Sequence, residues 1–552
     1  MVSLRGNGSS IAQARMLGLA LMASLAPARA QFTHPGCLSS QTDLNRMATK
    51  VSANAQPWKG SWDILVTNTN GFLGSTPEAV ATIYAGNASQ PENFMRLARD
   101  GARAYQLALR YHGSGTTIYA DKAIGILNSW AATHTGWEGD SNVGLRAGIY
   151  GYQFACAGEL LRNYSGWQAA DFAAFQTYMV DRFYGVNNSF LTGHYGTVPG
   201  HYWSNWDLST MASIMAIGVL CDNQTIFDQG LNYFYSGVGN GAITNAVTHV
   251  HPNGMGQWQE SGRDQGHSVM GPQVMGAICE IAWNQGIDLY GYLDNRLLAG
   301  VEYVSKYNLW EDVPYVAYVW RNGQLASPVD QVQPVISSVG RGAVRPGWDL
   351  LYNHYVNRKG GAAPYIGRYA EATRPEGGGF NYGPNSGGFD SLGFTTLTHS
   401  LDPIAAGAAP SALVACVEGR QITLSWAGST YAASYNVKRS TSSGGPYATL
   451  GVVGGNCLHY VDAGLTSGTT YYYVVSANAP GGESANSTEK AATCDGQMHG
   501  TVIGTAGSFN NSGAEGSLVF DGSVRNYFDA PTGSGSWAGI DLGDGASAVI
   551  TG

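Results

Sequence analysis

Three short segments of the chain bring together side chains that can move protons and stabilise negative charge. They span residues 201–207, 258–267 and 345–358, and each mixes tryptophan with imidazole, amide, guanidinium or phenol groups. Histidine and tyrosine are suited to general acid–base catalysis, whereas arginine and asparagine can stabilise an anionic intermediate in a preorganised site. Because only 12% of the residues are charged, this clustering indicates a functional site.

The second segment holds the most reactive combination. Glu260, Arg263 and His267 are three and four positions apart, so they would share one face of a helix. The glycines between them also allow a loop that ends near Pro272, in the first turn of the following helix. In both cases Arg263 and His267 stay close together. The alternative is a buried Glu-Arg-His network that only ties helices together.

The part of the chain that must position these residues is helical. Between residues 31 and 401, apolar residues recur with a period near 3.6, which predicts helices. The predicted helices span residues 92–112, 120–132, 149–161, 169–183, 208–220, 226–235, 274–283 and 296–307. A long series of antiparallel helices that each bury one face closes most economically into an all-α (α/α) toroid, with loops forming a cleft at one end.

Beyond a linker at residues 402–411, the apolar period changes to two. Short alternating strands at residues 422–426, 435–439, 460–462 and 471–476 predict an all-β, immunoglobulin-like sandwich. Residues 412–493 resemble a fibronectin type III module, through Trp426 and a leucine-to-tyrosine corner at residues 465–471. Residues 494–552 resemble the opening half of a discoidin-like (factor 5/8 type C) β-sandwich, which implies binding to a cell-surface or matrix glycan.

Bulk properties narrow the location and the partners. Residues 1–30 have the charged start, apolar run and small-residue ending of a signal peptide, so we expect a secreted or periplasmic protein. No later apolar run approaches the roughly 20 residues that span a bilayer, so we expect no membrane insertion. The net charge of −9 and the lack of a Lys/Arg block argue against nucleic acid as a partner. The spacing of the seven cysteines does not define a disulfide pairing.

Four motifs of the helical region resemble the alginate lyase superfamily. They are His-Tyr-Trp-Ser-Asn-Trp at 201–206, the segment 260–267, Trp-Asn-Gln-Gly-Ile-Asp-Leu-Tyr-Gly at 283–291 and Tyr-Asn-His-Tyr-Val-Asn-Arg at 352–358. The resemblance covers most of residues 31–400 and is closest to the branch that acts on alginate or glucuronan. It implies a polysaccharide lyase that cleaves an acidic, uronic-acid polymer by β-elimination.

The same resemblance implies roles for individual residues. Asn205 would bind the substrate carboxylate and His267 would remove the proton at C5. Tyr352 would protonate the leaving oxygen, and Arg263 or Arg345 would supply positive charge. Further residues expected to bind substrate are His201, Tyr202, Trp203, Trp206, Trp258, Glu260, Tyr355 and Arg358.

Several of these assignments have competitors within the chain. Tyr202 and Tyr355 compete with Tyr352 for the role of the acid. In the better-known family pattern consecutive asparagines precede a histidine, whereas here a serine precedes Asn205 and a tryptophan follows it. His201 therefore competes with His267 for the role of the base. The tryptophans can either stack on sugar rings or pack between helices.

The same residues also allow two functions outside this class. A glycoside hydrolase on the same helical scaffold would use a pair of carboxylates, for which Glu260, Asp264, Asp207 and Glu376 are available. A non-catalytic protein that only binds polysaccharide would lack proton-transfer groups, and these are present. The residue types in the three segments therefore favour proton abstraction beside a carboxylate.

The histidines do not form a recognisable metal motif. His249 and His251 are separated by one residue, and His194 and His201 are seven positions apart. Neither an HExxH motif nor an Asp/Glu-His cluster at ligand spacing accompanies them. We therefore expect neither a metal nor another cofactor.

Overall fold

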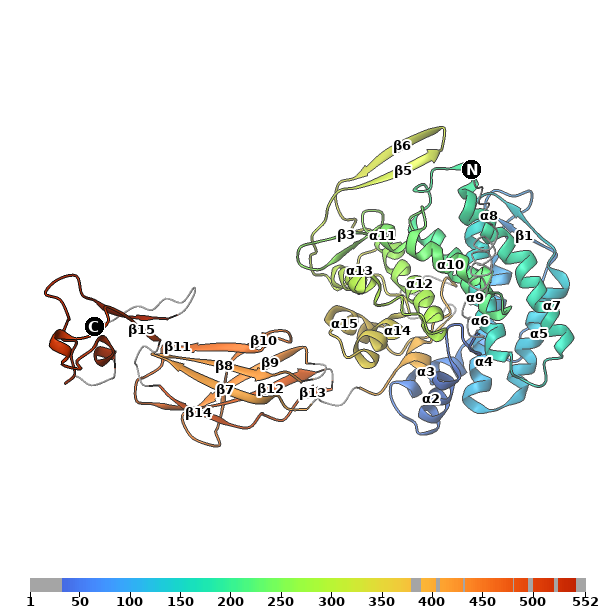
Figure 1. Ribbon diagram of the computed structural model, residues 1–552. Helices are drawn as coiled ribbons and strands as arrows, with labels where there is room; N and C mark the ends of the chain where they lie inside the picture. The colour runs from blue at the N-terminus through green and yellow to red at the C-terminus, as the bar shows by residue number, and fades with distance from the viewer. Residues whose placement is uncertain are drawn as a thin grey trace, which may run out of the picture. The chain divides into compact units, whose positions relative to one another are not determined.

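The chain forms two compact units (Figure 1). The computed structural model describes residues 32–378, 389–403, 408–429, 432–479, 481–494, 500–520 and 525–542, so the expected signal peptide lies outside the described residues. One unit comprises Met1–Leu351 and Tyr365–Ser400, and the other comprises Tyr352–Pro364 and Leu401–Gly552. The first unit is mostly helical, whereas strands make up most of the regular structure of the second.

Each of the eight helices predicted from the sequence is present. The longer helices are α2 (Gln41–Ser52), α3 (Trp58–Thr67), α4 (Met95–Ser114), α5 (Thr117–Thr133), α6 (Asn142–Leu161), α7 (Ala169–Tyr178), α8 (Gly185–Gly193), α9 (Ser204–Leu220), α10 (Gln224–Ser236), α12 (Gln265–Asn284), α13 (Tyr292–Asn308) and α15 (Pro364–Thr373). A π-helix at Met179–Tyr184 continues α7, and the short helices are α11 (Ile243–Ala246), α14 (Trp348–Tyr352) and α16 (Thr395–His399). No helix among the described residues is long and apolar enough to cross a membrane.

Two glycines of α6 pack closely against α9, and the residues they contact show the relative direction of the two helices. A Cβ atom on Gly148 would lie 2.9 Å from the carbonyl carbon of Ser209, and one on Gly151 would lie 2.2 Å from Oγ of Ser213. The later glycine on α6 contacts the later residue on α9, so residue numbers increase in the same direction along both helices. The helices α6 and α9 are therefore parallel and begin at the same end of the first unit.

The helix α4 packs on α6 in the same direction. Phe94, directly before α4, stacks on Tyr150 with 6.3 Å between ring centroids. Further along, a Cβ atom on Gly101 would lie 3.1 Å from the ring of Phe154. The first turns of α4, α6 and α9 therefore lie at one end of the unit, the end that carries Asn205.

Three two-stranded sheets accompany the helices in the described part of the first unit. They pair β1 (Thr82–Ala85) with β2 (Gly136–Gly139), β3 (Val247–Val250) with β4 (Gly256–Trp258), and β5 (Tyr318–Gln324) with β6 (Ser327–Gln333). The last pair is an antiparallel hairpin that projects from the helices (Figure 1). The periodicity that predicts the helices gives no indication of this hairpin.

The second unit is built around two sheets. One has the order β10 (Ala448–Gly454), β9 (Ser434–Ser440), β12 (Thr470–Ala479) and β13 (Gly482–Glu483), with β14 (Lys490–Thr493) also paired to β12; the other has the order β11 (His459–Ala463), β8 (Gln421–Ala427) and β7 (Ser411–Glu418). Both sheets contribute to one hydrophobic cluster around Trp426 and Tyr435. The four predicted strands are all present. Further along the chain, β15 (Thr501–Gly504) pairs with β16 (Ala538–Asp541).

The corner expected before β12 is also present. The hydroxyl oxygen of Tyr471 accepts a hydrogen bond from the backbone N–H of Thr466 at 3.1 Å, and Leu465 is buried in the cluster between the sheets. A tyrosine hydroxyl that bonds back to the preceding backbone is typical of immunoglobulin-like domains.

Candidate active site

Asp264 starts α12 and holds His267 in place. Its Oδ1 accepts the backbone N–H of His267 at 2.9 Å, which makes Asp264 the N-cap of the helix. Its Oδ2 lies 2.8 Å from Nδ1 of the same histidine. Neither sequence alternative holds. Glu260 and Arg263 precede the helix and do not share a helix face with His267, and the helix begins at Gln265 and contains Pro272, so no loop extends to that proline.

The contacts of Asp264 define which nitrogen of His267 can act. Burial alone would raise the pKa of Asp264, but its hydrogen bonds with His267 and the charges of His267 and Arg263 lower that pKa overall. An ionised carboxylate only accepts hydrogen bonds, so Nδ1 of His267 carries a proton, and in the neutral imidazole Nε2 is the basic nitrogen. The imidazole is 36% exposed. His267 thus has the orientation and access that a general base requires.

Glu260 joins the start of α9 to the segment before α12. Its Oε1 accepts hydrogen bonds from Oγ of Ser204 at 2.9 Å and from the backbone N–H of Asn205 at 3.0 Å. Its Oε2 accepts from Arg263 at 2.8 Å. Glu260 is 0% exposed, so it positions Asn205 and Arg263 instead of contacting substrate as expected.

The side chain of Asn205 carries an unsatisfied polar atom. Asn205 is 3% exposed, and its side-chain oxygen has no hydrogen-bond partner. A buried polar atom without a partner costs about 1–3 kcal/mol. The atom here is an acceptor, which a donor such as water or a sugar hydroxyl can complete, whereas the side-chain NH₂ of Asn205 is the group that can donate to a carboxylate. The guanidinium of Arg263 lies nearby on the same carboxylate, Glu260. One buried anion thus binds both the backbone of Asn205 and the guanidinium of Arg263.

The β5–β6 hairpin reaches this group of residues. The indole of Trp320 stacks on Trp203 with 4.6 Å between centroids and 15° between planes, and its Nε1–H donates to the carbonyl of His201 at 3.0 Å. The backbone N–H of Gly323 donates to Nδ1 of His201 at 3.1 Å. Arg263 lies 4.9 Å from the ring centroid of Trp203. Sequence reasoning missed Trp320. The Asn-Gly pair at residues 322–323 is a hairpin signal, but it lies within β5, and the turn falls at residues 325–326.

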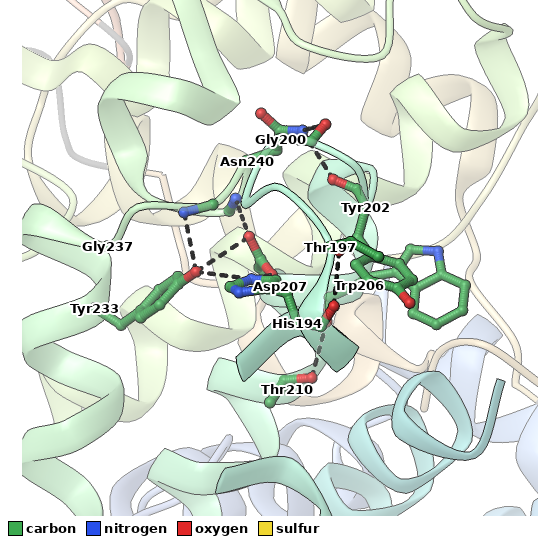
Figure 2. A network of polar contacts seen from close by, with 12 residues as sticks. His194, Thr197, Gly200, Tyr202, Trp206, Asp207, Thr210, Tyr233, Gly237 and Asn240 are labelled. Carbon is green, nitrogen blue, oxygen red and sulfur yellow. Dashed lines mark hydrogen bonds and ion pairs between the residues drawn. The ribbon is translucent and has the colours of Figure 1, made fainter. Parts of the chain in front are cut away.

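A second polar network fixes the loop that precedes α9 (Figure 2). Asp207 accepts from His194 at 3.1 Å, and the hydroxyl of Tyr233 lies 3.2 Å from the same histidine nitrogen. Asn240 donates to the carbonyl of Tyr202 at 2.8 Å. The ring of Tyr202 packs against that of Trp206 at 4.7 Å. These contacts hold residues 200–207 in one conformation, and they occupy the fully buried Asp207.

Burial also limits the other candidate carboxylates. Glu376 is fully buried and accepts backbone N–H groups of Gly347 and Trp348 and the hydroxyl of Thr395. Burial and the charge of Asp349 raise the pKa of Glu376 to about 7. Since Asp207, Glu260 and Glu376 are all enclosed by protein donors, the structure does not favour a hydrolase that uses one of these pairs.

The remaining predicted residues fall into three places. Trp258 is fully buried, and a Cβ on Gly271 would lie 2.4 Å from its ring, so Trp258 is a core residue and not a stacking platform. Arg345 pairs with Asp390 at 2.9 Å. Tyr352, Tyr355 and Arg358 lie in the segment 352–364, which groups with the second unit and forms a π-helix at Asn353–Arg358. The convergence of Tyr352 with Asn205 and His267 stays a prediction.

No group of three or more histidine, cysteine, aspartate or glutamate side chains that could hold a metal ion occurs in the described part of the chain. His249 and His251 are neighbours, with 4.6 Å between ring centroids. Two imidazoles alone fall short of the three protein ligands that catalytic zinc sites use.

The contacts of Glu260 lead to a prediction. In Glu260→Gln one carboxylate oxygen becomes an NH₂ group, so either Arg263 or the start of α9 loses its acceptor. A lost hydrogen bond to a charged group costs about 1.5–3 kcal/mol, and we expect kcat to fall about tenfold or more. The control is Glu280→Gln, another fully buried glutamate, which accepts from the Tyr290 hydroxyl at 2.8 Å. Equal losses of kcat in both variants would mean that Glu260 only stabilises the fold.

Comparison with known proteins gives matches to both units. Residues 66–312 match the alginate lyase family model. Alginate lyase A1-III from Sphingomonas species A1 aligns at 15% identity, over 68% of this chain and 98% of that chain, with a TM-score of 0.45. An alginate lyase from Bacteroides ovatus aligns at 15% identity, over 68% and 100%, with a TM-score of 0.45. An Fn3-like protein from Clostridium thermocellum aligns at 45% identity, over 16% and 92%, with a TM-score of 0.15. No curated protein matches.

The family match includes the helices that present Asn205, Arg263 and His267. The family match and the proton-transfer groups on these helices both indicate a lyase. The chain matches the alginate lyase family model over residues 66–312 and is a polysaccharide lyase.

Proposed function

We propose that the chain is an exported lyase that cleaves a uronic-acid polymer, alginate or glucuronan, by β-elimination. The observation that supports this most is the continuous set of contacts from Asn205 through Glu260, Arg263 and Asp264 to His267. It holds an amide, a guanidinium and a basic imidazole nitrogen in one region. These are the groups needed to stabilise a substrate carboxylate and to remove the proton next to it.

The proposed reaction uses these groups in sequence. Asn205 and Arg263 bind the carboxylate and stabilise the enolate-like charge that develops when Nε2 of His267 removes the C5 proton. The C5–H electron pair then forms the C4–C5 double bond while the C4–O4 bond breaks. A tyrosine, for which Tyr352 is our candidate, gives its proton to O4. The products are an unsaturated sugar at the new non-reducing end and a new reducing end.

The proposal also covers the closure of the helical unit, the fold of the second unit and the export of the chain. We expect the helical unit to close as an (α/α) toroid, the two sheets of the second unit to form a fibronectin type III sandwich, and residues 494–552 to bind cell-surface or matrix glycan. Cleavage of residues 1–30 would release the chain to the periplasm or the medium. An exported lyase would meet its acidic polymer outside the cytoplasm.

One assay separates this proposal from its rivals. The purified protein is incubated with polymannuronate, polyguluronate, glucuronan and neutral glycans, and ultraviolet absorbance and reducing ends are recorded together. We expect both signals to rise on at least one uronan. Reducing ends without absorbance would indicate hydrolysis, and binding without either signal would indicate a non-catalytic protein.

The identity of the acid is tested with three tyrosine variants. We expect Tyr352→Phe to lower kcat by about 10²-fold, because loss of a general acid removes a contribution of that order. Tyr355→Phe and Tyr202→Phe should keep most of the activity. A large loss confined to Tyr202→Phe would move the role of the acid to the loop before α9.

A further inference from the structure

Arg146, in the opening turns of α6, forms no ion pair with any of the residues that the structure describes. Its guanidinium lies 3.9 Å above the ring of Phe94, and its Nε is buried without a hydrogen-bond partner. Tyr150, one turn further along α6, is its polar neighbour. Asp390, whose charge also acts on Tyr150, is already paired with Arg345 at 2.9 Å. Among the described residues, no carboxylate forms an ion pair with Arg146.

Most other partly buried arginines of the first unit form ion pairs with carboxylates. Arg103 pairs with Glu78 and Asp100, Arg162 with Asp222, and Arg374 with Asp349. Removing a charged group from water without a partner is costly. The aromatic face of Phe94 recovers part of that cost for Arg146. Arg146 is therefore a candidate to receive an anion from outside the fold.

The helix register places Arg146 close to the level of Asn205. Because Gly148 lies beside Ser209 and the two helices are parallel, Arg146 lies at about the level of Asp207. That is two residues beyond Asn205 on α9, or about 3 Å along the axis. Arg146 and Asn205 therefore belong to the same end of the first unit but to neighbouring helices.

We propose that Arg146 binds the carboxylate of a second uronic-acid unit, next to the unit that reacts. The inference rests on the proposed function, since only a polymer with a carboxylate on each sugar would present anions to Asn205 and Arg146 together. A guanidinium can bind a carboxylate through two parallel hydrogen bonds. The parallel starts of α4, α6 and α9 add positive potential at the same end. Arg146 thus contributes to recognition of an acidic chain and not to bond cleavage.

The test measures binding separately from turnover. Short and long oligosaccharides prepared from alginate and from glucuronan are titrated calorimetrically into a His267→Ala protein with or without Arg146→Ala. We expect Arg146→Ala to weaken the binding of long oligosaccharides roughly tenfold to a hundredfold, the value of a charged hydrogen-bonded contact. The gain in affinity from short to long oligosaccharides should also shrink. Arg146→Lys, which keeps the charge but not the paired donors, should lie between the two.

Arg110 provides a matched control. Its guanidinium also lies over an aromatic ring, 4.2 Å from that of Tyr119, and its Nε is also buried without a partner. It sits towards the end of α4, away from the first turns. Arg110→Ala should lower the melting temperature without changing the affinity for oligosaccharide.

Two results would overturn the inference: equal affinities with and without Arg146, or an equal loss in Arg110→Ala. Either can occur while the wild-type protein still produces unsaturated sugars, which leaves the proposed function standing. If instead no uronan yields an unsaturated product but Arg146→Ala still weakens binding, the result supports the carboxylate subsite at Arg146 and contradicts the proposed lyase reaction.

Discussion

Replacement of His267 by alanine should lower kcat by roughly 10²–10⁴-fold, the usual contribution of a well-placed general base. The structure provides the reason for assigning this role to Nε2. Nδ1 is 2.8 Å from an ionised Asp264, whereas the ring is 36% exposed and its other nitrogen is left as the base. The measurement is the initial rate of absorbance increase on the preferred uronan, with a thermal melt to show that the fold survives.

Two further variants make this result specific. Asp264→Asn keeps a side-chain oxygen that can cap α12 but removes the carboxylate that fixes the imidazole, so kcat should fall by less than in His267→Ala. His112→Ala removes a histidine that bonds the carbonyl of Leu160 at 2.7 Å, and it should affect stability only. Near-normal turnover in His267→Ala would return the role of the base to His201.

The elements of this fold could be predicted from apolar periodicity, but their functional ends could not. Periodicity starts three helices at residues 149, 208 and 274, whereas α6 begins at Asn142, α9 at Ser204 and α12 at Gln265. The missing turns contain Arg146, Asn205 and His267, and each includes polar residues or glycines that weaken the apolar pattern. Side chains that serve a site leave no hydrophobic pattern, so apolar periodicity cannot locate the helix ends that carry the site.

The candidate site was predictable to the extent that its residues are close in sequence. Arg263, Asp264 and His267 are neighbours in the chain and remain neighbours in space. The link from Glu260 to Asn205 crosses 55 residues, and the stack of Trp203 on Trp320 depends on a hairpin whose position no local pattern defines. The sequence resemblance supplied Asn205 as a candidate, but only the tertiary contacts identify Glu260 as the residue that holds it.

Asn205→Ala should lower activity while leaving stability unchanged or higher. Loss of a preorganised donor to a developing anion costs about 10²–10³-fold in kcat, so kcat/KM on the uronan should fall by that order. Stability should be unchanged or higher, because the substitution removes a buried amide oxygen that has no partner, while the backbone N–H of residue 205 keeps Glu260 as acceptor.

The matched control is Asn187→Ala. Asn187 is also fully buried with an unpartnered side-chain oxygen, but its amide donates to Oγ of Ser213 at 2.6 Å. This variant should lose melting temperature and keep kcat/KM. If Asn205→Ala instead melts earlier and retains its activity, the two asparagines are equivalent structural residues and the carboxylate must be bound elsewhere. A loss of activity without a loss of stability is the pattern expected where a fold tolerates an unsatisfied polar group for the sake of its substrate.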